Sequence, residues 1–242
     1  MFMIASFLWI AWRQQSHSKF SSYDFIPDLV MNLNSKRFIC RRGTSDYWHA
    51  SYDYEPETTE FLSKQQGNVF LDVGAHIGRY TVLLANNFQK VVSAEPFGET
   101  FRILSSNVKT NYLSNIVLVN EALAEKEGHG ELYINEENPG QCSMSIQSSR
   151  HVQVPLTTAD SLLKRLAIPP EDVSLVKSDV EGAEQRVLQG AKHLLEQGSP
   201  KLLVEAWDLK YLSELEDILD PLGYRVKYKM GHNYLFEKVR GR

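Results

Sequence analysis

The sequence predicts an α/β fold in which a doubly wound, mostly parallel sheet carries helices on both faces. Two observations predict it: apolar runs that each end at a polar residue, and helical segments that lie between these runs. The runs are "NVFLDV", "KVVSAE", "NIVLVN", "VSLVKSDV" and "KLLVEAW". Near-continuous apolar runs are typical of strands buried on both faces, and their alternation with helices indicates parallel order.

The segments between the runs complete this pattern. Apolar residues recur at helical spacing in 77–88, 98–111 and 183–197, which predicts a helix in each segment. A small β insertion is expected between the third and fourth core strands, from the short runs "GHGELYIN", "CSMSIQ" and "HVQVPLTT". From 208 to 239 the sequence predicts a helix, a glycine turn and a closing hairpin of two strands.

Composition limits the class of protein. A chain of 242 residues, 43% of them hydrophobic, can form one sizeable domain, or one domain with an extension. Its net charge of −4 gives no broad basic face, so no nucleic-acid partner is expected. Cys40 and Cys142 are its two cysteines and show no CxxC spacing, which indicates a reducing, cytoplasmic compartment and argues against a structural zinc site.

The first residues of the chain are apolar on all sides. As a helix, "MFMIASFLWIAW" (1–12) would span about 18 Å, less than the roughly 30 Å of a bilayer core. Three alternatives are open: an interfacial membrane anchor, the tail of a signal-anchor, or a helix packed on the domain. We therefore divide the chain into this apolar segment (1–19), a helical lead-in and lid (20–66), and the α/β domain (67–242).

A glycine turn follows the first core strand and predicts a cofactor site. Asp72, Gly74 and Gly78 form D-x-G-x-x-x-G; Gly74 allows close approach of the backbone to a ligand, and Gly78 allows close packing of the next helix. A dinucleotide turn, G-x-G-x-x-G, would need a small residue where His76 stands. The carboxylate of Asp72 favours a cofactor with an ammonium and a sulfonium group, such as S-adenosylmethionine, over a phosphate bridge.

Glu95 provides the second part of this site. It lies at the end of the second core strand, 21 residues after Gly74, where a carboxylate can accept both hydroxyls of a ribose. A glycine turn or a strand-end acid alone often reflects topology only. Their joint occurrence at this spacing favours cofactor binding.

The end of the fourth core strand is the expected place of chemistry, because ligands of open parallel sheets bind beyond the carboxyl ends of the strands. In "KSDVEGAEQ" the Gly182 turn exposes Asp179 and Glu181, which we expect to be catalytic. Asp179 or Glu181 would take a proton from the acceptor, and His76 is an alternative base. Glu184 is expected to favour the start of a helix. Glu205, at the end of the fifth strand, is equally consistent with acceptor binding and with a strand-end ion pair. No clear set of metal ligands is present.

Several stretches resemble, in order, the motifs of the FkbM family, a branch of the class I S-adenosylmethionine-dependent methyltransferases. They are "RRGTSDYWHASYDYEPE", "VFLDVGAHIGRYTVLLA", "VVSAEPFGETFRILSSNVKTN", "VNEALAEKEG", "LVKSDVEGAEQRVLQGA", "LLVEAW" and "LGYRVKY…NYLFEK". The D-V-E-G-A-E block is the most specific of them. One departure is that the family usually has Asn where this chain has His76.

The resemblance implies a Rossmann-like, seven-stranded sheet with an antiparallel last strand, and S-adenosylmethionine as the cofactor of 67–242. It implies O-methylation of a hydroxyl on a small molecule, glycan or lipid. Tyr54 and Glu55 would lie over the site, and the "NEAL" turn at Asn120 would border the adenine. The cofactor-binding residues would be Asp72, Gly74, Ala75, His76, Gly78, Glu95, Pro96, Glu121, Ala122 and Asp179.

Two alternative functions fit the same fold. A nicotinamide-dependent oxidoreductase would need a small residue in place of His76 and a well-placed Tyr-x-x-x-Lys, which the sequence lacks. A catalytically inactive interaction module would have no need of Asp72, Glu95 and Asp179. The sequence does not indicate the oligomeric state or the acceptor.

Overall fold

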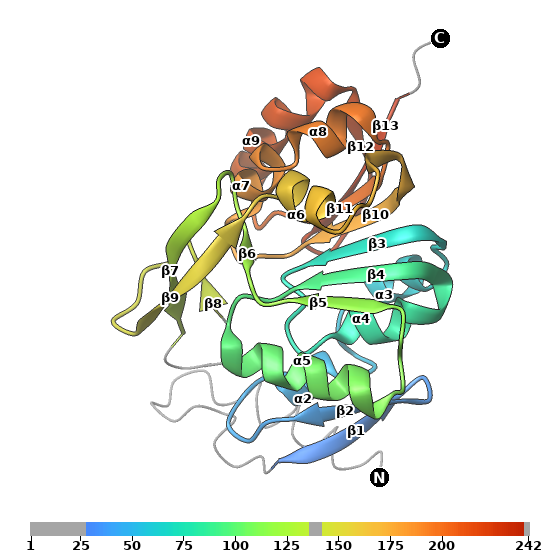
Figure 1. Cartoon of the computed structure of the whole chain (residues 1–242), viewed down its shortest axis with the longest axis vertical. Helices are drawn as coiled ribbons and strands as arrows, with labels where there is room; N and C mark the ends of the chain where they lie inside the picture. The colour runs from blue at the N-terminus through green and yellow to red at the C-terminus, as the bar shows by residue number, and fades with distance from the viewer. Residues whose placement is uncertain (1–27, 136–141, 240–242) are drawn as a thin grey trace.

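A computed structural model describes residues 28–135 and 142–239, which form a central sheet, a second smaller sheet and an N-terminal hairpin (Figure 1). The strands are β1 (Leu29–Leu33), β2 (Lys36–Cys40), β3 (Gly67–Val73), β4 (Phe88–Ala94), β5 (Ile116–Val119), β6 (Ala122–Leu123), β7 (Gly128–Ile134), β8 (Cys142–Ser143), β9 (His151–Thr157), β10 (Val173–Ser178), β11 (Lys201–Glu205), β12 (Tyr224–Met230) and β13 (Asn233–Lys238). The α-helices are α2 (Asp46–His49), α3 (Pro56–Ser63), α4 (Arg79–Leu84), α5 (Gly98–Thr110), α6 (Ala159–Arg165), α7 (Glu184–Gln189), α8 (Lys192–Gln197) and α9 (Leu209–Leu219).

The central sheet confirms the predicted fold class. Its seven strands follow the order β12-β13-β11-β10-β3-β4-β5, and the neighbours from β11 to β5 are parallel. The last strand, β13, pairs antiparallel with both β11 and β12, so it is inserted between them and β12 forms the edge of the sheet. The four strands β11, β10, β3 and β4 therefore end at one edge, which is where a ligand of such a sheet binds.

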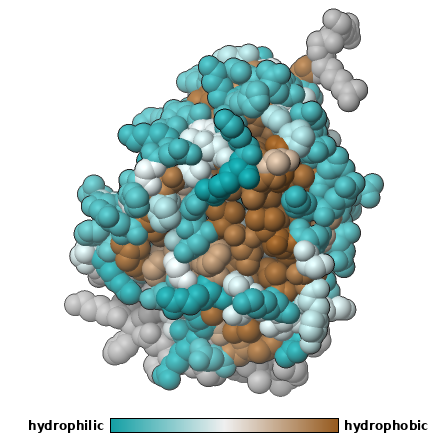
Figure 2. Space-filling model, viewed as in Figure 1, coloured by the Kyte–Doolittle hydropathy of each residue, from teal (hydrophilic) through white to brown (hydrophobic). Residues whose placement is uncertain are grey.

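Helices cover both faces of this sheet. Apolar residues of α6, α7, α8 and α9 form one core cluster with the strands, whereas those of α3, α4 and α5 pack on the opposite side. The edge strand β5 is covered less completely, since Ile116, Val117 and Leu118 are only half-buried. Figure 2 shows apolar residues gathered in this region, within a largely polar surface.

The helix predicted over 183–197 is divided into α7 and α8 by Gly190. A Cβ atom on Gly190 would lie 2.0 Å from the carbonyl oxygen of Ala124, so the chain approaches the start of the insertion too closely for any side chain. The prediction of a single helix was therefore wrong. The contact with Ala124 lies far away in the chain, so the local sequence pattern does not show it.

The β insertion between the third and fourth core strands is confirmed. It forms a four-stranded sheet of order β6-β9-β7-β8, in which β7 pairs antiparallel with β9 over Gly128–Tyr133. Figure 1 shows this sheet standing beside one end of the central strands. Residues of β7 and β8 therefore reach the region beyond the central sheet, as described below.

The N-terminal segment differs from the helical lead-in that was expected. β1 and β2 form an antiparallel hairpin, with Asn34 and Ser35 in the left-handed region at φ 48° and 62°. The hairpin packs on α5, where Asn107 Oδ1 accepts a hydrogen bond of 2.7 Å from the Ile39 N–H. The short helices α2 and α3 follow the hairpin. Apolar residues of the lead-in and of the sheet domain pack in the same core cluster.

No helix within 28–135 and 142–239 is both long and apolar enough to cross a membrane. The apolar segment 1–12 lies outside the described residues.

Candidate functional site

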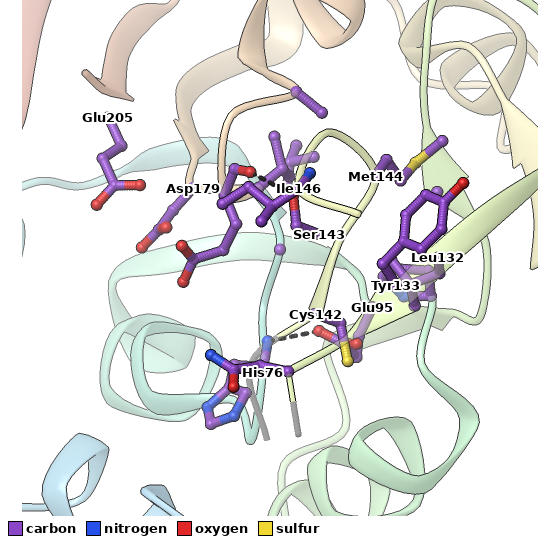
Figure 3. A pocket seen from close by; sticks show the side chains of 18 of the residues that line it. His76, Glu95, Leu132, Tyr133, Cys142, Ser143, Met144, Ile146, Asp179 and Glu205 are labelled. Carbon is purple, nitrogen blue, oxygen red and sulfur yellow. Dashed lines mark hydrogen bonds between the residues drawn. The ribbon is translucent and has the colours of Figure 1, made fainter. Parts of the chain in front are cut away.

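A cavity of about 1060 Å³ lies beyond the carboxyl ends of the central strands. Four parts of the chain line it: the ends of β3, β4, β10 and β11, the lead-in from α2 to Tyr54, the insertion at β7 and β8, and His232 between β12 and β13. Figure 3 shows the carboxyl groups of Asp179 and Glu205 on one side and Leu132, Tyr133 and Met144 of the insertion on the other, with Glu95 beside Cys142.

Gly74 allows two strand ends to touch beneath this cavity. It has φ +79°, and a Cβ atom on it would lie 1.8 Å from the carbonyl oxygen of Asp179. The adjacent Val73 carbonyl accepts a hydrogen bond of 3.1 Å from the Asp179 N–H. Gly74 is therefore required for contact between the β3 and β10 turns, and it also lines the cavity.

Gly78 has a similar steric role at the start of α4. It has φ +87°, and a Cβ atom there would lie 2.4 Å from Leu104 Cδ1 of α5. The close packing expected at Gly78 is present, but its partner is the neighbouring helix α5.

Glu95 presents a carboxylate that is already oriented by the backbone. Its Oε2 accepts a hydrogen bond of 3.0 Å from the His76 N–H, and its Oε1 accepts one of 2.9 Å from the Phe97 N–H. Burial, opposed by these two hydrogen bonds, raises the pKa of Glu95 to about 7. Each oxygen keeps a second lone pair, so the group has the capacity to accept two further hydrogen bonds from neighbouring hydroxyls.

The structure brings most of the predicted site residues to the cavity. The lining members are Gly74, His76, Glu95, Pro96, Glu121, Ala122, Asp179 and Glu181. Asn120, beside them, fixes the turn after β4 by donating to the carbonyls of Glu95 and Pro96 at 2.8 and 3.0 Å.

Asp72, Ala75 and Gly78 do not line the cavity. Asp72 is 2% exposed, and it accepts a hydrogen bond of 2.6 Å from Thr81 Oγ1. Burial raises the pKa of Asp72, although the charge of Lys177 and the Thr81 hydrogen bond oppose this rise. Asp72 thus joins the end of β3 to α4 beneath the cavity, whereas the sequence suggested that it contacts the cofactor.

Lys177 and Asp179 form an ion pair under the cavity. Lys177 is 2% exposed, its Nζ lies 2.7 Å from Asp179 Oδ2, and it also lies 5.1 Å above the centre of the Tyr80 ring. Burial alone would raise the pKa of Asp179, but the charge and hydrogen bond of Lys177 lower it. Asp179 is therefore an ionised carboxylate at neutral pH.

Glu205 lies beside Asp179 at the end of the next strand, β11. Burial first, and then the negative charges of Asp179 and Glu181, raise the pKa of Glu205 to about 9. Its Oε2 is buried, and its side chain forms hydrogen bonds with Asp179 and Trp207. Among the described residues Glu205 has no ion pair, so the structure does not contain the strand-end ion pair considered from sequence.

The turn that carries Glu181 is held from two sides. Ser143 Oγ donates a hydrogen bond of 2.6 Å to the Glu181 carbonyl, which ties the insertion to the turn. Glu184, fully buried, accepts one of 2.9 Å from the Val180 N–H and another of 2.7 Å from the Tyr211 hydroxyl. Glu181 itself is held at φ 56°. The helix-start acid Glu184 therefore also orders the turn that precedes the helix.

The lead-in contributes aromatic rings to the cavity wall, and these rings contact one another at tilted angles. The ring centroids of Tyr54 and His49 are 4.6 Å apart, and those of His49 and His76 are 4.3 Å apart. Arg79 holds this segment by donating from Nη1 to the His49 carbonyl at 2.6 Å and from Nη2 to the Tyr54 carbonyl at 3.1 Å. Arg79 was not predicted from the sequence. The signal for it was a basic residue directly after the glycine turn, at the start of an otherwise apolar helix.

Glu55 is placed differently from the expectation. It does not line the cavity; its Oε2 accepts a hydrogen bond of 2.7 Å from the Tyr80 hydroxyl, and its Oε1 accepts one of 2.8 Å from Asn233 Nδ2. Glu55 thus joins the lead-in to α4 and β13, whereas its neighbour Tyr54 does line the cavity.

Among residues 28–135 and 142–239, no three His, Cys, Asp or Glu side chains are grouped to hold a metal ion. Cys142 lines the cavity, and burial raises the pKa of its thiol to about 12, so the thiol is protonated at neutral pH.

Solved structures that the chain matches include several methyltransferases. M. jannaschii TYW2 in complex with AdoMet has 13% identity and a TM-score of 0.49, with 92% of this chain and 89% of that chain covered. Precorrin-6y C5,15-methyltransferase from Geobacter metallireducens has 14% identity and a TM-score of 0.47, with 78% and 88% covered. An rRNA methylase from Streptococcus thermophilus has 13% identity and a TM-score of 0.49, with 76% and 95% covered. At these values the likenesses carry no information on the acceptor.

No curated protein is similar enough to the chain to count as a relative. A family model matches instead, and its description is a methyltransferase FkbM domain, over residues 72–226. The match covers more than half of the chain and includes the glycine turn, Glu95 and both carboxylates of the β10 and β11 ends. The chain therefore belongs to the FkbM family of methyltransferases, whose cofactor is S-adenosylmethionine.

Proposed function

We propose that the protein is an O-methyltransferase that acts on a hydroxyl of a small molecule, glycan or lipid. The observation that carries this proposal is the ionised carboxylate of Asp179, held by Lys177 at 2.7 Å where β10 ends at the cavity. An alcohol is a poor nucleophile, and a positioned carboxylate that takes its proton contributes about 10²–10⁴-fold to such a reaction.

The residues around Glu95 fit the cofactor. A buried carboxylate with its inner lone pairs satisfied by two backbone N–H groups is suited to accept the two hydroxyls of a ribose. Pro96, Glu121 and Ala122, which line the cavity beyond Glu95, would border the adenine. Gly74 and His76 also line the cavity, and the amino-acid part would lie near Gly74, whose backbone approaches Asp179. When bound, S-adenosylmethionine supplies a methyl group, and its sulfur keeps the electron pair of the S–CH₃ bond that breaks.

The chain's own residues would orient the acceptor and take its proton. Asp179 accepts a hydrogen bond from the acceptor hydroxyl, which directs the oxygen toward the incoming methyl group. As the oxygen gains the methyl group, its proton becomes strongly acidic, so even a carboxylate with a lowered pKa is a sufficient base. Asp179 then passes this proton to water at the open side of the cavity. Glu181, on the adjoining turn, adds a second acidic group that binds acceptor hydroxyls.

The test is turnover of labelled S-adenosylmethionine by the full chain over a panel of acceptors. The panel contains a neutral methyl glycoside, a long-chain alcohol, a primary amine and total RNA. We expect label in the hydroxyl compounds, and a loss of about 100-fold in kcat with Asp179→Asn. The exposed Asp217→Asn is the matched carboxyl-to-amide control, and it should leave the rate unchanged. Label in the amine or the RNA alone, or full activity of Asp179→Asn, contradicts the proposal.

A further inference from the structure

His49, the last residue of α2, lines the cavity with one ring nitrogen already bonded. Its Nδ1 lies 3.0 Å from the Ser45 carbonyl oxygen, which can only accept, so Nδ1 carries a proton and donates it. A neutral imidazole has one N–H group and one lone pair, so the lone pair is on Nε2. Among the described residues none bonds Nε2, and the protein does not enclose this atom, so a ligand in the cavity can reach it.

The ring of His49 is uncharged at neutral pH. Burial lowers the pKa of His49 below its ordinary value, although the hydrogen bond to Ser45 and the charge of Asp46 oppose this effect. The adjacent His76 is also neutral, because burial and the neighbouring His49 lower its pKa to about 3. Nε2 of His49 is therefore a hydrogen-bond acceptor, and the ring is not a cation that would bind an anion.

The direction of this lone pair is fixed before any ligand binds. The ring centroid of His49 lies 4.6 Å from that of Tyr54 and 4.3 Å from that of His76. The backbone beneath it is held by Arg79, which is 4% exposed and donates to the His49 carbonyl at 2.6 Å. The acceptor atom is thus positioned by contacts on both sides of the ring and by its own backbone.

His49 borders the part of the cavity where the amino-acid end of the cofactor would lie. Its neighbour His76 belongs to the glycine turn, two residues after Gly74. The amino-acid end of S-adenosylmethionine carries an α-ammonium group, which is a positively charged hydrogen-bond donor. No Lys or Arg lines the cavity in the part of the chain that the structure describes, so no cation repels this group there.

We propose that Nε2 of His49 accepts a hydrogen bond from the α-ammonium group of S-adenosylmethionine. The lead-in is then a part of the cofactor site. His49 precedes residues 72–226, which the family model matches, so this role does not follow from membership of the family. The inference concerns the cofactor and does not rest on the proposed O-methylation.

The test is isothermal titration of the full chain with S-adenosylhomocysteine and with 5′-methylthioadenosine. Both probes contain the adenosine and the sulfur atom, but 5′-methylthioadenosine lacks the amino-acid end. His49→Phe keeps an aromatic ring against Tyr54 and His76 and removes the lone pair. S-adenosylhomocysteine should bind this variant about tenfold more weakly, as expected for one lost hydrogen bond to a charged group. The affinity for 5′-methylthioadenosine should not change, which also shows that the variant is folded.

A conservative variant separates the lone pair from the shape of the ring. His49→Gln places an amide oxygen near the position of Nε2, and it should keep most of the affinity for S-adenosylhomocysteine. The matched control is His193→Phe, because His193 is exposed on α8 and does not line the cavity. This control should bind both probes as the unmodified chain does.

Several results would overturn the inference. Unchanged binding of S-adenosylhomocysteine by His49→Phe would show that Nε2 serves another group, such as the acceptor. Equal losses for the two probes, or equal affinities of His49→Phe and His49→Gln for S-adenosylhomocysteine, would show that the ring has only a structural role. No binding of S-adenosylhomocysteine by the unmodified chain would also overturn it.

A failure of the proposed function gives a different result. A chain that methylates an amine and no hydroxyl loses the proposed O-methylation, whereas the titrations with His49→Phe and His49→Gln keep their predicted outcome. A chain that methylates hydroxyls but shows no effect of His49→Phe keeps the proposed function and loses only this inference.

Discussion

The ammonium group of Lys177 lies 2.7 Å from the carboxylate of Asp179, and the lysine is 2% exposed. A buried lysine keeps its charge only beside an acid, and a buried acid keeps its charge only beside a cation. The two groups therefore depend on each other, and this pair fixes the charge at the end of β10.

Replacing Lys177 by Met should destabilise the protein by about 1–3 kcal/mol, because the half-buried Asp179 would lose its cation. Urea denaturation of the full chain measures this. The double variant Lys177→Met/Asp179→Asn should lose clearly less than the sum of the two single changes, since it removes both charges. Additive losses would mean that the two groups are not coupled.

Replacing Gly231, Gly78 or Gly74 by Ala should lower the free energy of unfolding by increasing amounts, in that order. Gly231→Ala needs only a left-handed alanine, because its Cβ would meet nothing within 4 Å, and should cost about 1–2 kcal/mol. Gly78→Ala also pushes against the movable end of Leu104 and should cost more. Gly74→Ala meets the backbone of Asp179 and should cost most, with loss of methyl transfer. Equal unfolding free energies for the three variants would contradict the close contact of the β3 and β10 turns.

The free energy of unfolding of the protein without cofactor should decrease as the pH rises, over a range set by Glu205. Its folded pKa of about 9 lies above the ordinary 4.5, so the folded state holds a proton that the unfolded state releases. Stability from this group is present below pH 4.5 and is lost as the pH rises to 9. Glu95 acts in the same direction up to about pH 7.

Between pH 7 and 9 the pH lies above the raised pKa of Glu95 and below that of Glu205. Urea denaturation at several pH values should show a shallower decline for Glu205→Gln than for the unmodified chain over this range, while Asp217→Asn changes nothing. Parallel pH profiles of Glu205→Gln and the unmodified chain would show that Glu205 is ionised when folded.

Replacing Arg79 by Met should release the lead-in from α4. The guanidinium donates to the carbonyls of His49, Ser51 and Tyr54 at 2.6, 2.7 and 3.1 Å, and hydrogen bonds to charged groups contribute about 1.5–3 kcal/mol each. Hydrogen exchange should accelerate at residues 45–54 and stay slow in β3, β4 and β10. The exposed Arg102→Met is the control on the next helix. Unchanged exchange at 45–54 would show that other contacts hold the lead-in.

The central sheet could be predicted from sequence because its signals are local. Each of the strands β3, β4, β5, β10 and β11 lies in a near-continuous apolar run, and the glycine turn and the hairpin of β12 and β13 carry their own turn residues. The β1–β2 hairpin could not be predicted as readily. Its turn is Asn34–Ser35 without glycine, and its stability comes from α5, about 70 residues away in the chain, through Asn107 and Asn111.

The candidate site shows the same limit. Glu95 and Asp179 were found because strand ends mark the ligand edge of a parallel sheet. The position of Asp72 was not predicted correctly. Alternate residues of a strand face opposite sides, and only the three-dimensional structure identifies Thr81 as the partner of Asp72. Glu205 remained undecided in the sequence, since its pairing with Asp179 follows from the register of β10 and β11, which are separated by α7 and α8.

The central claim is that the cavity binds S-adenosylmethionine with Glu95 at the ribose. Isothermal titration of the full chain with S-adenosylhomocysteine, beside NADH, tests it most directly, with Glu95→Ala as the variant and Asp217→Asn as the control. The account predicts micromolar binding of S-adenosylhomocysteine, no binding of NADH, and a loss of tenfold or more in Glu95→Ala, as expected from about 1.4 kcal/mol or more for buried charged hydrogen bonds. Binding that Glu95→Ala leaves unchanged, or no binding to the folded chain, would contradict it.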